Sequence, residues 1–233
     1  MIIKRISCKV KEGQKEIFYE YQKQWEPLSK VKGFLGQLGG WSEKQPLTAC
    51  VYSFWESQAD YQYFMKEVHD RIYVNSGQES SFTSIDVNMF QEELRISGLE
   101  ESFANVLRNG NFIRVSLSQV KEQKTEHFVE MQKKVWNFGL RKAEEMLGGT
   151  FSFSQKESNY FLVLSVWKSE KFHQKYMELN FPELIETAKP KNDVLELVGE
   201  KFKVEEAWRV SPTVPLINRN FVSNDIKQSG AFL

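Results

Sequence analysis

The stretch VYSFWESQADYQYFM, Val51–Met65, has a counterpart further along the chain in VLSVWKSEKFHQKYM, Val163–Met177. An ungapped alignment of residues 34–65 with residues 146–177 places identical residues at ten of thirty-two positions. A period of about 110 residues is far too long for a solenoid repeat. The pattern therefore indicates that a whole domain has been duplicated.

The duplication extends toward the start of each half. The tripeptide VKE at Val10–Glu12 recurs at Val120–Glu122, and Phe18 and Phe128 follow at the same spacing. The offset between equivalent residues of the two halves is two residues larger after the first helix than before it. This difference predicts a small insertion within that helix.

Within one copy the hydrophobic period changes in a definite order. Ile2, Lys4, Ile6, Cys8 and Val10 alternate with polar neighbours, as in a half-buried strand. A helical stripe follows, then two strands joined by a polar turn, a second helix with Ser57 as N-cap, and a last strand. The predicted elements of the first copy are a strand at 2–10, a helix at 11–30, strands at 34–41 and 47–55, a helix after Ser57 and a strand at 82–94. Those of the second are a strand at 112–120, a helix at 121–146, a hairpin at 147–167, a helix at 170–188 capped by Ser169 and a strand at 201–210.

The order βαββαβ is the ferredoxin-like pattern, so the predicted fold class is α+β. Helices cover only one face of such a sheet, and two sheets in one chain can cover each other's bare face. We therefore expect an intramolecular pseudo-dimeric α+β barrel. The predicted divisions are a first repeat at 1–96, a linker at 97–110, a second repeat at 111–210 and a C-terminal arm at 211–233.

The amino-acid composition limits which binding partners and which location are expected. The 233 residues are 41% hydrophobic and 14% aromatic, and 31 basic side chains balance 31 acidic ones. A neutral chain lacks the field that recruits nucleic acid or anionic membranes, so neither partner is expected. No apolar run suits a signal peptide or a membrane span, which predicts a cytoplasmic protein with Cys8 and Cys50 reduced. The sequence leaves open a monomeric pseudo-dimer or a homodimer.

The hairpin end V-[YL]-S-[FV]-W-[EK]-S, followed by an aromatic helix, resembles the dimeric α+β barrel proteins grouped with the antibiotic-biosynthesis monooxygenases. The run FLGQLGGW at Phe34–Trp41 resembles the uncharacterised YdbC-like proteins of bacilli, a bacterial family of tandem barrels. The resemblance implies a pocket between sheet and helices in each half. It also implies oxidation of quinol-like or polycyclic substrates without metal or flavin, or, in a sister branch, haem degradation.

The haem-degrading branch does not match this sequence residue by residue. Its members carry a Trp nine positions after the hairpin tryptophan, where this chain has Phe64 and Tyr176. The iron-binding His of that branch falls at Val74 and Glu186. The central Asn of its first strand is also missing, so haem degradation is disfavoured.

The two copies differ at one place that bears on chemistry. His69-Asp70-Arg71, with Tyr73 close behind, stands where the second copy has Phe181-Pro182-Glu183. An imidazole that titrates near neutrality is a candidate base toward an acidic phenol, so His69 and Tyr73 are the candidate catalytic residues. Sequence adjacency predicts that Asp70 points away from His69. The alternative is that His69 is an ordinary surface residue near a helix C-terminus.

Aromatic residues supply the candidate binding surface. Trp25, Trp41, Trp55 and Phe64 are the candidate substrate-binding residues, and core packing is the alternative role for each. Neither histidine spacing nor any glycine-rich fingerprint indicates a metal or a cofactor, so none is expected.

Two functional hypotheses remain. The first is a cofactor-independent monooxygenase-like enzyme that acts on a small aromatic or quinol-like compound in an apolar pocket of the first repeat. The second is a non-catalytic barrel that binds an apolar metabolite or a protein partner. Loss of His69 would abolish oxygen uptake under the first hypothesis and leave ligand binding intact under the second.

Overall fold

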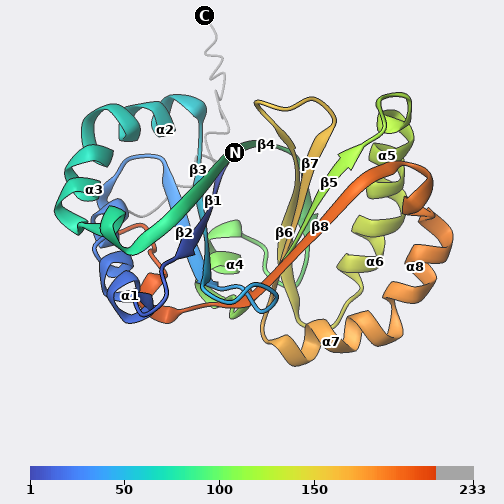
Figure 1. The fold of residues 1–233 in the computed structure, drawn as a ribbon. Helices are drawn as coiled ribbons and strands as arrows, with labels where there is room; N and C mark the ends of the chain where they lie inside the picture. Colours follow the sequence, from blue (N-terminus) through green and yellow to red (C-terminus); the bar gives the residue numbers. More distant parts are fainter. Residues whose placement is uncertain (214–233) are drawn as a thin grey trace, which may run out of the picture.

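The structure is a computed structural model and describes residues 1–213 (Figure 1). The first repeat comprises β1 Ile2–Val10, α1 Lys15–Lys23, β2 Phe34–Trp41, β3 Thr48–Trp55, α2 Gln58–Phe64, α3 Asp70–Ser76 and β4 Phe82–Ser97. After α4, Phe103–Asn109, the second repeat comprises β5 Phe112–Val120, α5 Thr125–Met131, α6 Asn137–Arg141, β6 Met146–Ser154, β7 Tyr160–Trp167, α7 Glu170–Leu179, α8 Phe181–Ala188 and β8 Val194–Lys203.

The strands form one curled antiparallel sheet in the order β2-β3-β1-β4-β6-β7-β5-β8. Strand β4 is long enough to pair with β1 through its first part and with β6 through residues 90–97, and so it joins the two repeats. At the opposite ends of the sheet, β2 and β8 approach each other. There the amide of Glu43 donates to the carbonyl of Lys201, and the amide of Glu205 donates to that of Gly39. The fold is the expected α+β barrel of two ferredoxin-like repeats.

The two repeats are equivalent in register as well as in element order. Ile2 pairs with Trp55 in the first repeat, and Phe112 pairs with Trp167 in the second. The β2–β3 and β6–β7 hairpins also shift register at the same place, just before Gly36 and Gly148. A side chain in one repeat can therefore be compared directly with its counterpart in the other.

The sheet has two buried faces, and each is covered differently. In Figure 1, α1, α2 and α3 lie outside the sheet on one side and α5 to α8 lie outside it on the other. The inner faces of the two repeats pack on each other through apolar residues that include Ile3, Phe54, Val115, Leu164 and Phe202. Each repeat thus supplies the cover that the other's bare face requires.

An ion cluster lies at the edge of this interior, with Arg5 and Glu200 largely buried and Asp86 exposed. Arg5 of β1 donates to Asp86, with Nη1 to Oδ2 at 2.6 Å, and to Glu200 of β8, with Nε to Oε2 at 3.3 Å. The hydroxyl of Tyr52 also donates to Glu200. Because a buried charge is tolerated only when it is paired and hydrogen-bonded, this cluster holds β1 and β8 in one relative position.

Several helices are shorter than the sequence predicts. The first helix ends at Lys23, and a 3₁₀ helix at Glu26–Lys30 follows it. In the second repeat, a π turn at Gln132–Trp136 separates α5 from α6. A π turn accommodates an inserted residue without ending a helix, so it lies where the change of register requires extra chain.

The helix predicted at 170–188 is two helices, α7 and α8. Pro182 lacks an amide hydrogen and cannot donate to the carbonyl of Glu178, so the first helix ends at Leu179 and Pro182 lies in the first turn of the second. Ser169 makes no side-chain cap, which corrects the prediction for that residue. Ser57 does cap α2, accepting a hydrogen bond from the amide of Asp60 at 3.1 Å, as predicted.

The end of the second repeat differs most from its prediction. Its last strand is Val194–Lys203 rather than 201–210. Residues 204–213 instead return to the first repeat, where Trp208 is buried against Phe18 and Trp41 and Val210 bridges to Gln37 of β2. The predicted linker contains α4, which Ser102 caps. Of the predicted C-terminal arm, residues 214–233 lie outside the described residues.

Within residues 1–213, no helix combines the length and the apolar character that crossing a membrane requires.

The closure of the barrel generates a prediction about Gly40. A Cβ atom at this position would lie 2.1 Å from the carbonyl oxygen of Lys203 and 2.7 Å from the ring of Phe202. Gly40→Ala must therefore push β2 away from β8 and should lower the free energy of unfolding by about 1–3 kcal/mol. Urea denaturation measures the change. Gly199→Ala is the control, because its nearest neighbour is the flexible end of Lys44 at 3.1 Å. Equal losses in the two variants would contradict the tight contact between β2 and β8.

Candidate functional site

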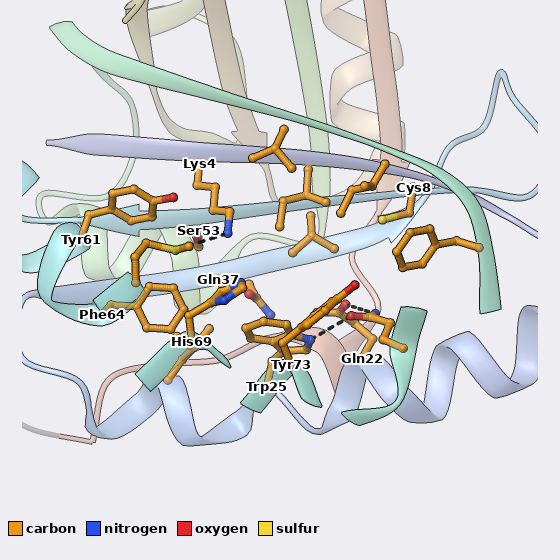
Figure 2. A pocket seen from close by; sticks show the side chains of 18 residues that line it. Lys4, Cys8, Gln22, Trp25, Gln37, Ser53, Tyr61, Phe64, His69 and Tyr73 are labelled. Atoms are coloured by element: carbon orange, nitrogen blue, oxygen red, sulfur yellow. Dashed lines mark hydrogen bonds between the residues drawn. The ribbon is translucent and has the colours of Figure 1, made fainter. Parts of the chain in front are cut away.

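A cavity of about 280 Å³ lies between the helices of the first repeat and the outer face of its strands. Lys4, Ile6 and Cys8 of β1 line its strand side, together with Val51 and Ser53 of β3. Figure 2 shows Trp25, His69 and Tyr73 facing these strands from the helical side. The cavity exists because the helices stand off from the sheet between these two sets of side chains.

The cavity is open to solvent beside β4. Ile85 and Val87, which are 47% and 43% exposed, line its margin. Apolar side chains at the entrance and aromatic side chains within are typical of sites for small planar compounds. A ligand can therefore enter without a large movement of the helices.

The aromatic wall centres on His69. Its ring centroid lies 5.6 Å from that of Trp25, 5.6 Å from that of Phe64 and 5.7 Å from that of Tyr73, which it stacks on at 14°. The His69 side chain is only 18% exposed. His69 is the last residue of a π turn at Met65–His69 that follows α2.

Trp25 is held in place by buried amides. Its indole nitrogen donates to Oε1 of Gln78 at 3.1 Å, and Nε2 of Gln78 donates to Oε1 of Gln22 at 2.8 Å. These two hydrogen bonds link the indole to both buried amides and give the ring a fixed orientation. Fixed rings lose little entropy when a ligand binds.

His69 has the partner that a base requires. Its Nδ1 lies 2.9 Å from Oδ1 of Asp70, contrary to the expectation that Asp70 points away. A carboxylate at Nδ1 favours the tautomer with the proton on that nitrogen, and Nε2 is then the nitrogen that can accept a proton. Residues 1–213 provide Nε2 with no hydrogen-bond partner.

The other ionisable groups of the cavity stay protonated at neutral pH. Burial raises the pKa of the Cys8 thiol to about 12, and burial also raises the pKa values of Tyr61 and Tyr73. The pKa of the Lys4 ammonium shifts in the opposite direction: burial lowers it to about 8, and the amine is still mostly protonated at pH 7. Tyrosine and cysteine side chains in this cavity therefore serve as neutral donors rather than as bases.

Sequence reasoning overlooked Lys4, which is only 6% exposed and extends from β1 toward Met65 (Figure 2). The signal was present in the alternation of the first strand, where Lys4 occupies a position otherwise taken by apolar side chains. A cation in such a place needs a reason other than packing. Gln22, Gln78 and Tyr61 were also overlooked, and nothing in their spacing distinguishes them from surface residues.

Of the six candidate site residues, Trp25, Phe64, His69 and Tyr73 line the cavity. Trp41 does not, because it packs on Phe18 and Trp208 and lies under the Nζ of Lys15 at 4.9 Å. Trp55 is fully buried behind Phe64, with ring centroids 4.7 Å apart, and its indole donates to Ser53. Trp55 therefore supports the wall of the cavity from behind.

The equivalent cavity of the second repeat has a volume of only about 80 Å³. Phe181, the counterpart of His69, fills it: its ring packs on Trp136 at 5.6 Å and on Tyr176 at 6.1 Å. The Arg114 guanidinium lies over the same ring, 5.7 Å from its centroid. The two repeats thus share a framework, and the space at this position is larger in the first.

The other histidines lie in the second repeat. His173 is buried between Phe112 and Trp167, and burial lowers its pKa to about 4, so it is neutral. His127 is half exposed and contacts Asp193 at 2.7 Å. Within the described part of the chain, no three His, Cys, Asp or Glu side chains are grouped in a way that could hold a metal ion.

The fold and the outer cavities define a protein of the dimeric α+β barrel class that carries both repeats in one chain. Residues 2–90 match a family model described as a domain of unknown function, DUF4937. The chain is also 40% identical over 95 residues to the uncharacterised protein YdbC of Bacillus subtilis strain 168, covering 40% of this chain and 80% of that protein. The chain belongs to the family that includes YdbC.

Solved structures share the fold across most of the chain. A protein from Fusobacterium nucleatum, proposed to be a monooxygenase, superposes with a TM-score of 0.74 at 12% identity, over 90% of this chain and 94% of that one. An anthrone oxidase-like protein superposes with a TM-score of 0.68 at 11% identity, over 92% and 94% of the two chains. The class therefore includes monooxygenase-like proteins, and identities this low establish the fold alone.

Lys4 generates a prediction about stability. Its pKa is about 8 in the folded protein and near 10.5 in the unfolded chain, so folding is penalised while both forms are charged. Below pH 8 the penalty is complete. As pH rises from 8 to 10.5 the folded protein loses its proton first, and stability increases relative to a variant without the amine. Lys4→Met should therefore be more stable than the wild type by about 1–3 kcal/mol at pH 7, with a smaller difference at pH 10.

Urea denaturation at the two pH values tests this expectation. Lys9→Met is the matched control, because Lys9 lies on the same strand with its side chain exposed, and it should change stability by less than about 0.5 kcal/mol. A Lys4→Met variant that is less stable than wild type at pH 7 would show that the ammonium is well solvated or paired.

Proposed function

We propose that the protein is a cofactor-independent monooxygenase-like enzyme that binds a small aromatic or quinol-like compound in the cavity of the first repeat. The observation that carries this proposal is the position of the His69–Asp70 pair in the wall of a sizeable aromatic cavity. The second repeat, with the same framework, has Phe181 in place of His69 and little space. Chemistry is therefore assigned to the first repeat only.

The chemistry follows from the position of His69. Nε2 accepts a proton from an acidic phenol, or from a methylene group flanked by aromatic rings, and Asp70 stabilises the resulting imidazolium. The electron-rich substrate anion then reduces O₂. For a methylene substrate the carbon loses two hydrogen atoms and gains one oxygen atom as a carbonyl, and the second oxygen atom leaves as water.

The aromatic wall supplies the binding. Trp25, Phe64 and Tyr73 present ring faces and edges to a planar ligand, and aromatic contacts of this kind contribute about 0.5–1.5 kcal/mol each beyond area burial. The similarity to an anthrone oxidase-like protein supports a polycyclic substrate with an acidic hydrogen, because that protein shares the whole fold. The choice between catalysis and simple binding depends on His69.

Binding should be visible through Trp25. Among the tryptophans, Trp25 lines the first cavity and Trp136 the second. Titration with anthrone or 1,4-dihydroxynaphthalene should quench intrinsic fluorescence saturably, and Trp25→Phe should remove most of that change. Trp41→Phe is the matched control and should keep it, since Trp41 packs elsewhere. Undiminished quenching in Trp25→Phe would place the ligand outside this cavity.

Catalysis should depend on His69. With the same compounds the wild-type protein should consume O₂, and His69→Gln should lower the rate by about 10²–10⁴-fold, the usual contribution of a general base. An oxygen electrode measures the rate, and circular dichroism verifies the fold. His127→Gln is the control, because His127 forms a similar histidine–aspartate contact far from the cavity. Saturable binding without O₂ consumption would leave the non-catalytic binding protein as the better description.

A further inference from the structure

Two adjacent cations of β1 lie in different environments, one paired with carboxylates and the other without a carboxylate partner within residues 1–213. Arg5 points into the barrel interior and is paired with Asp86 and Glu200. Lys4 points to the other face of the strand, into the cavity, and is equally buried at 6% exposure. Within residues 1–213, no carboxylate oxygen lies within 4.0 Å of its Nζ.

The neighbours of the Lys4 ammonium are weak partners. Its Nζ lies 4.0 Å from Sδ of Met65 and 5.9 Å from the ring centroid of Tyr61. A thioether accepts hydrogen bonds poorly, and a ring face compensates for only part of the lost hydration. A buried ammonium without an anion costs stability, and such costs are typically retained at functional sites.

The second repeat carries a cation in the same place, and its guanidinium likewise lies over a ring face. Lys4 is opposite Ser53 in the β1–β3 ladder, and Arg114 is opposite Ser165 in the β5–β7 ladder. Phe181 covers Arg114, whereas its counterpart in the first repeat is His69, which leaves space beside Lys4. The framework therefore places a cation at the floor of both cavities, and the cavity beside Lys4 is the larger, at about 280 Å³ against about 80 Å³.

A second donor accompanies the ammonium. The hydroxyl oxygen of Ser53 accepts a hydrogen bond from the indole of Trp55 at 3.2 Å, so its own hydrogen is available to a ligand. Ser53 lines the cavity from the strand adjacent to Lys4. A ligand oxygen at this end of the cavity would meet a positive charge and a neutral donor, while its rings would meet the aromatic wall.

We propose that Lys4 is an anion-binding residue and that the cavity takes small aromatic compounds carrying an anionic oxygen, either a carboxylate or an ionised phenol or enol. This inference rests on the proposed binding function and specifies its ligand class. The anionic oxygen lies against Nζ of Lys4 and Oγ of Ser53, and the ring system lies between the strands and Trp25. For an enzyme, the same ammonium stabilises the anion that forms when His69 removes a proton.

The test compares two probes of nearly the same shape, 2-naphthoate and the neutral 2-naphthamide. Isothermal titration calorimetry at pH 7 should show naphthoate binding about 10–100-fold more tightly, the range expected of a charge-assisted hydrogen bond. Lys4→Met should remove this preference while leaving naphthamide affinity within about twofold. Lys9→Met should behave as wild type, and Lys4→Arg should retain the preference.

The outcomes distinguish anion binding by Lys4 from ligand binding by the cavity as a whole. Equal affinities for the two probes in the wild type, or a preference that survives in Lys4→Met, would overturn the role of Lys4 and leave the cavity as a binding site. Failure of both probes to bind would contradict both the proposed binding function and the anion-binding role of Lys4. The wild-type comparison needs no variant, so a misfolded Lys4→Met protein would not prevent a decision.

A third probe distinguishes the two sources of the anionic oxygen. 4-Nitrophenol becomes yellow when it ionises, and an ammonium beside its oxygen lowers its pKa. Increased phenolate absorption on binding at fixed pH, lost in Lys4→Met, would identify an ionised phenol as a ligand. Naphthoate selectivity without this absorption change would support anion binding by Lys4, with a carboxylate as the ligand group.

Discussion

The mutual cover of the two inner sheet faces is the constraint on which the rest of the molecule depends. A four-stranded ferredoxin-like sheet with helices on one side cannot leave its other side in water, and here each repeat buries that side against the other. The continuous pairing of β4 with β6 and the meeting of β2 with β8 follow from this cover. Apart from α4, whose Val106 and Leu107 join the inner apolar cluster, the helices lie outside, and the cavities form between those helices and the sheet.

The alternation of side chains along β1 connects this architecture to the site. Because successive residues of a strand face opposite sides, Arg5 serves the shared interior and Lys4 serves the outer cavity. Arg5 has two carboxylates and gives the interior a fixed register. Lys4 has none within residues 1–213. One dipeptide thus contributes to holding the repeats together and to the chemistry of the cavity.

Sequence patterns specified the strands better than the helices. Strands with clear alternation or near-continuous apolar character, such as Phe34–Trp41 and Phe112–Val120, have the predicted bounds. Apolar spacing predicts helices that are too long because it reveals neither π turns nor the break before Pro182, which the apolar stripe spans. The last strand was misplaced because Leu195, Leu197 and Val198 alternate poorly and are exposed on an edge.

The candidate site was partly accessible from sequence for a physical reason. His69 was found because duplication provides an internal comparison, and a difference between copies stands out against a shared framework. Lys4 was missed because its counterpart Arg114 is also basic, so the same comparison concealed it. Trp41 and Trp55 could not be assigned to cavity or core from spacing, since both roles require an apolar face, and only packing distinguishes them.

The contact between Arg5 and Glu200 joins residues separated by 195 positions, and its consequence concerns the order in which the chain is made. At typical rates of protein synthesis, about 100 residues take on the order of 5–20 s. Strands β1 to β4 therefore emerge from the ribosome well before β8, with Arg5 unpaired from Glu200 and the apolar inner face uncovered. The inner face of the first repeat therefore stays exposed until the second repeat is made, because the contacts that cover it are long-range ones.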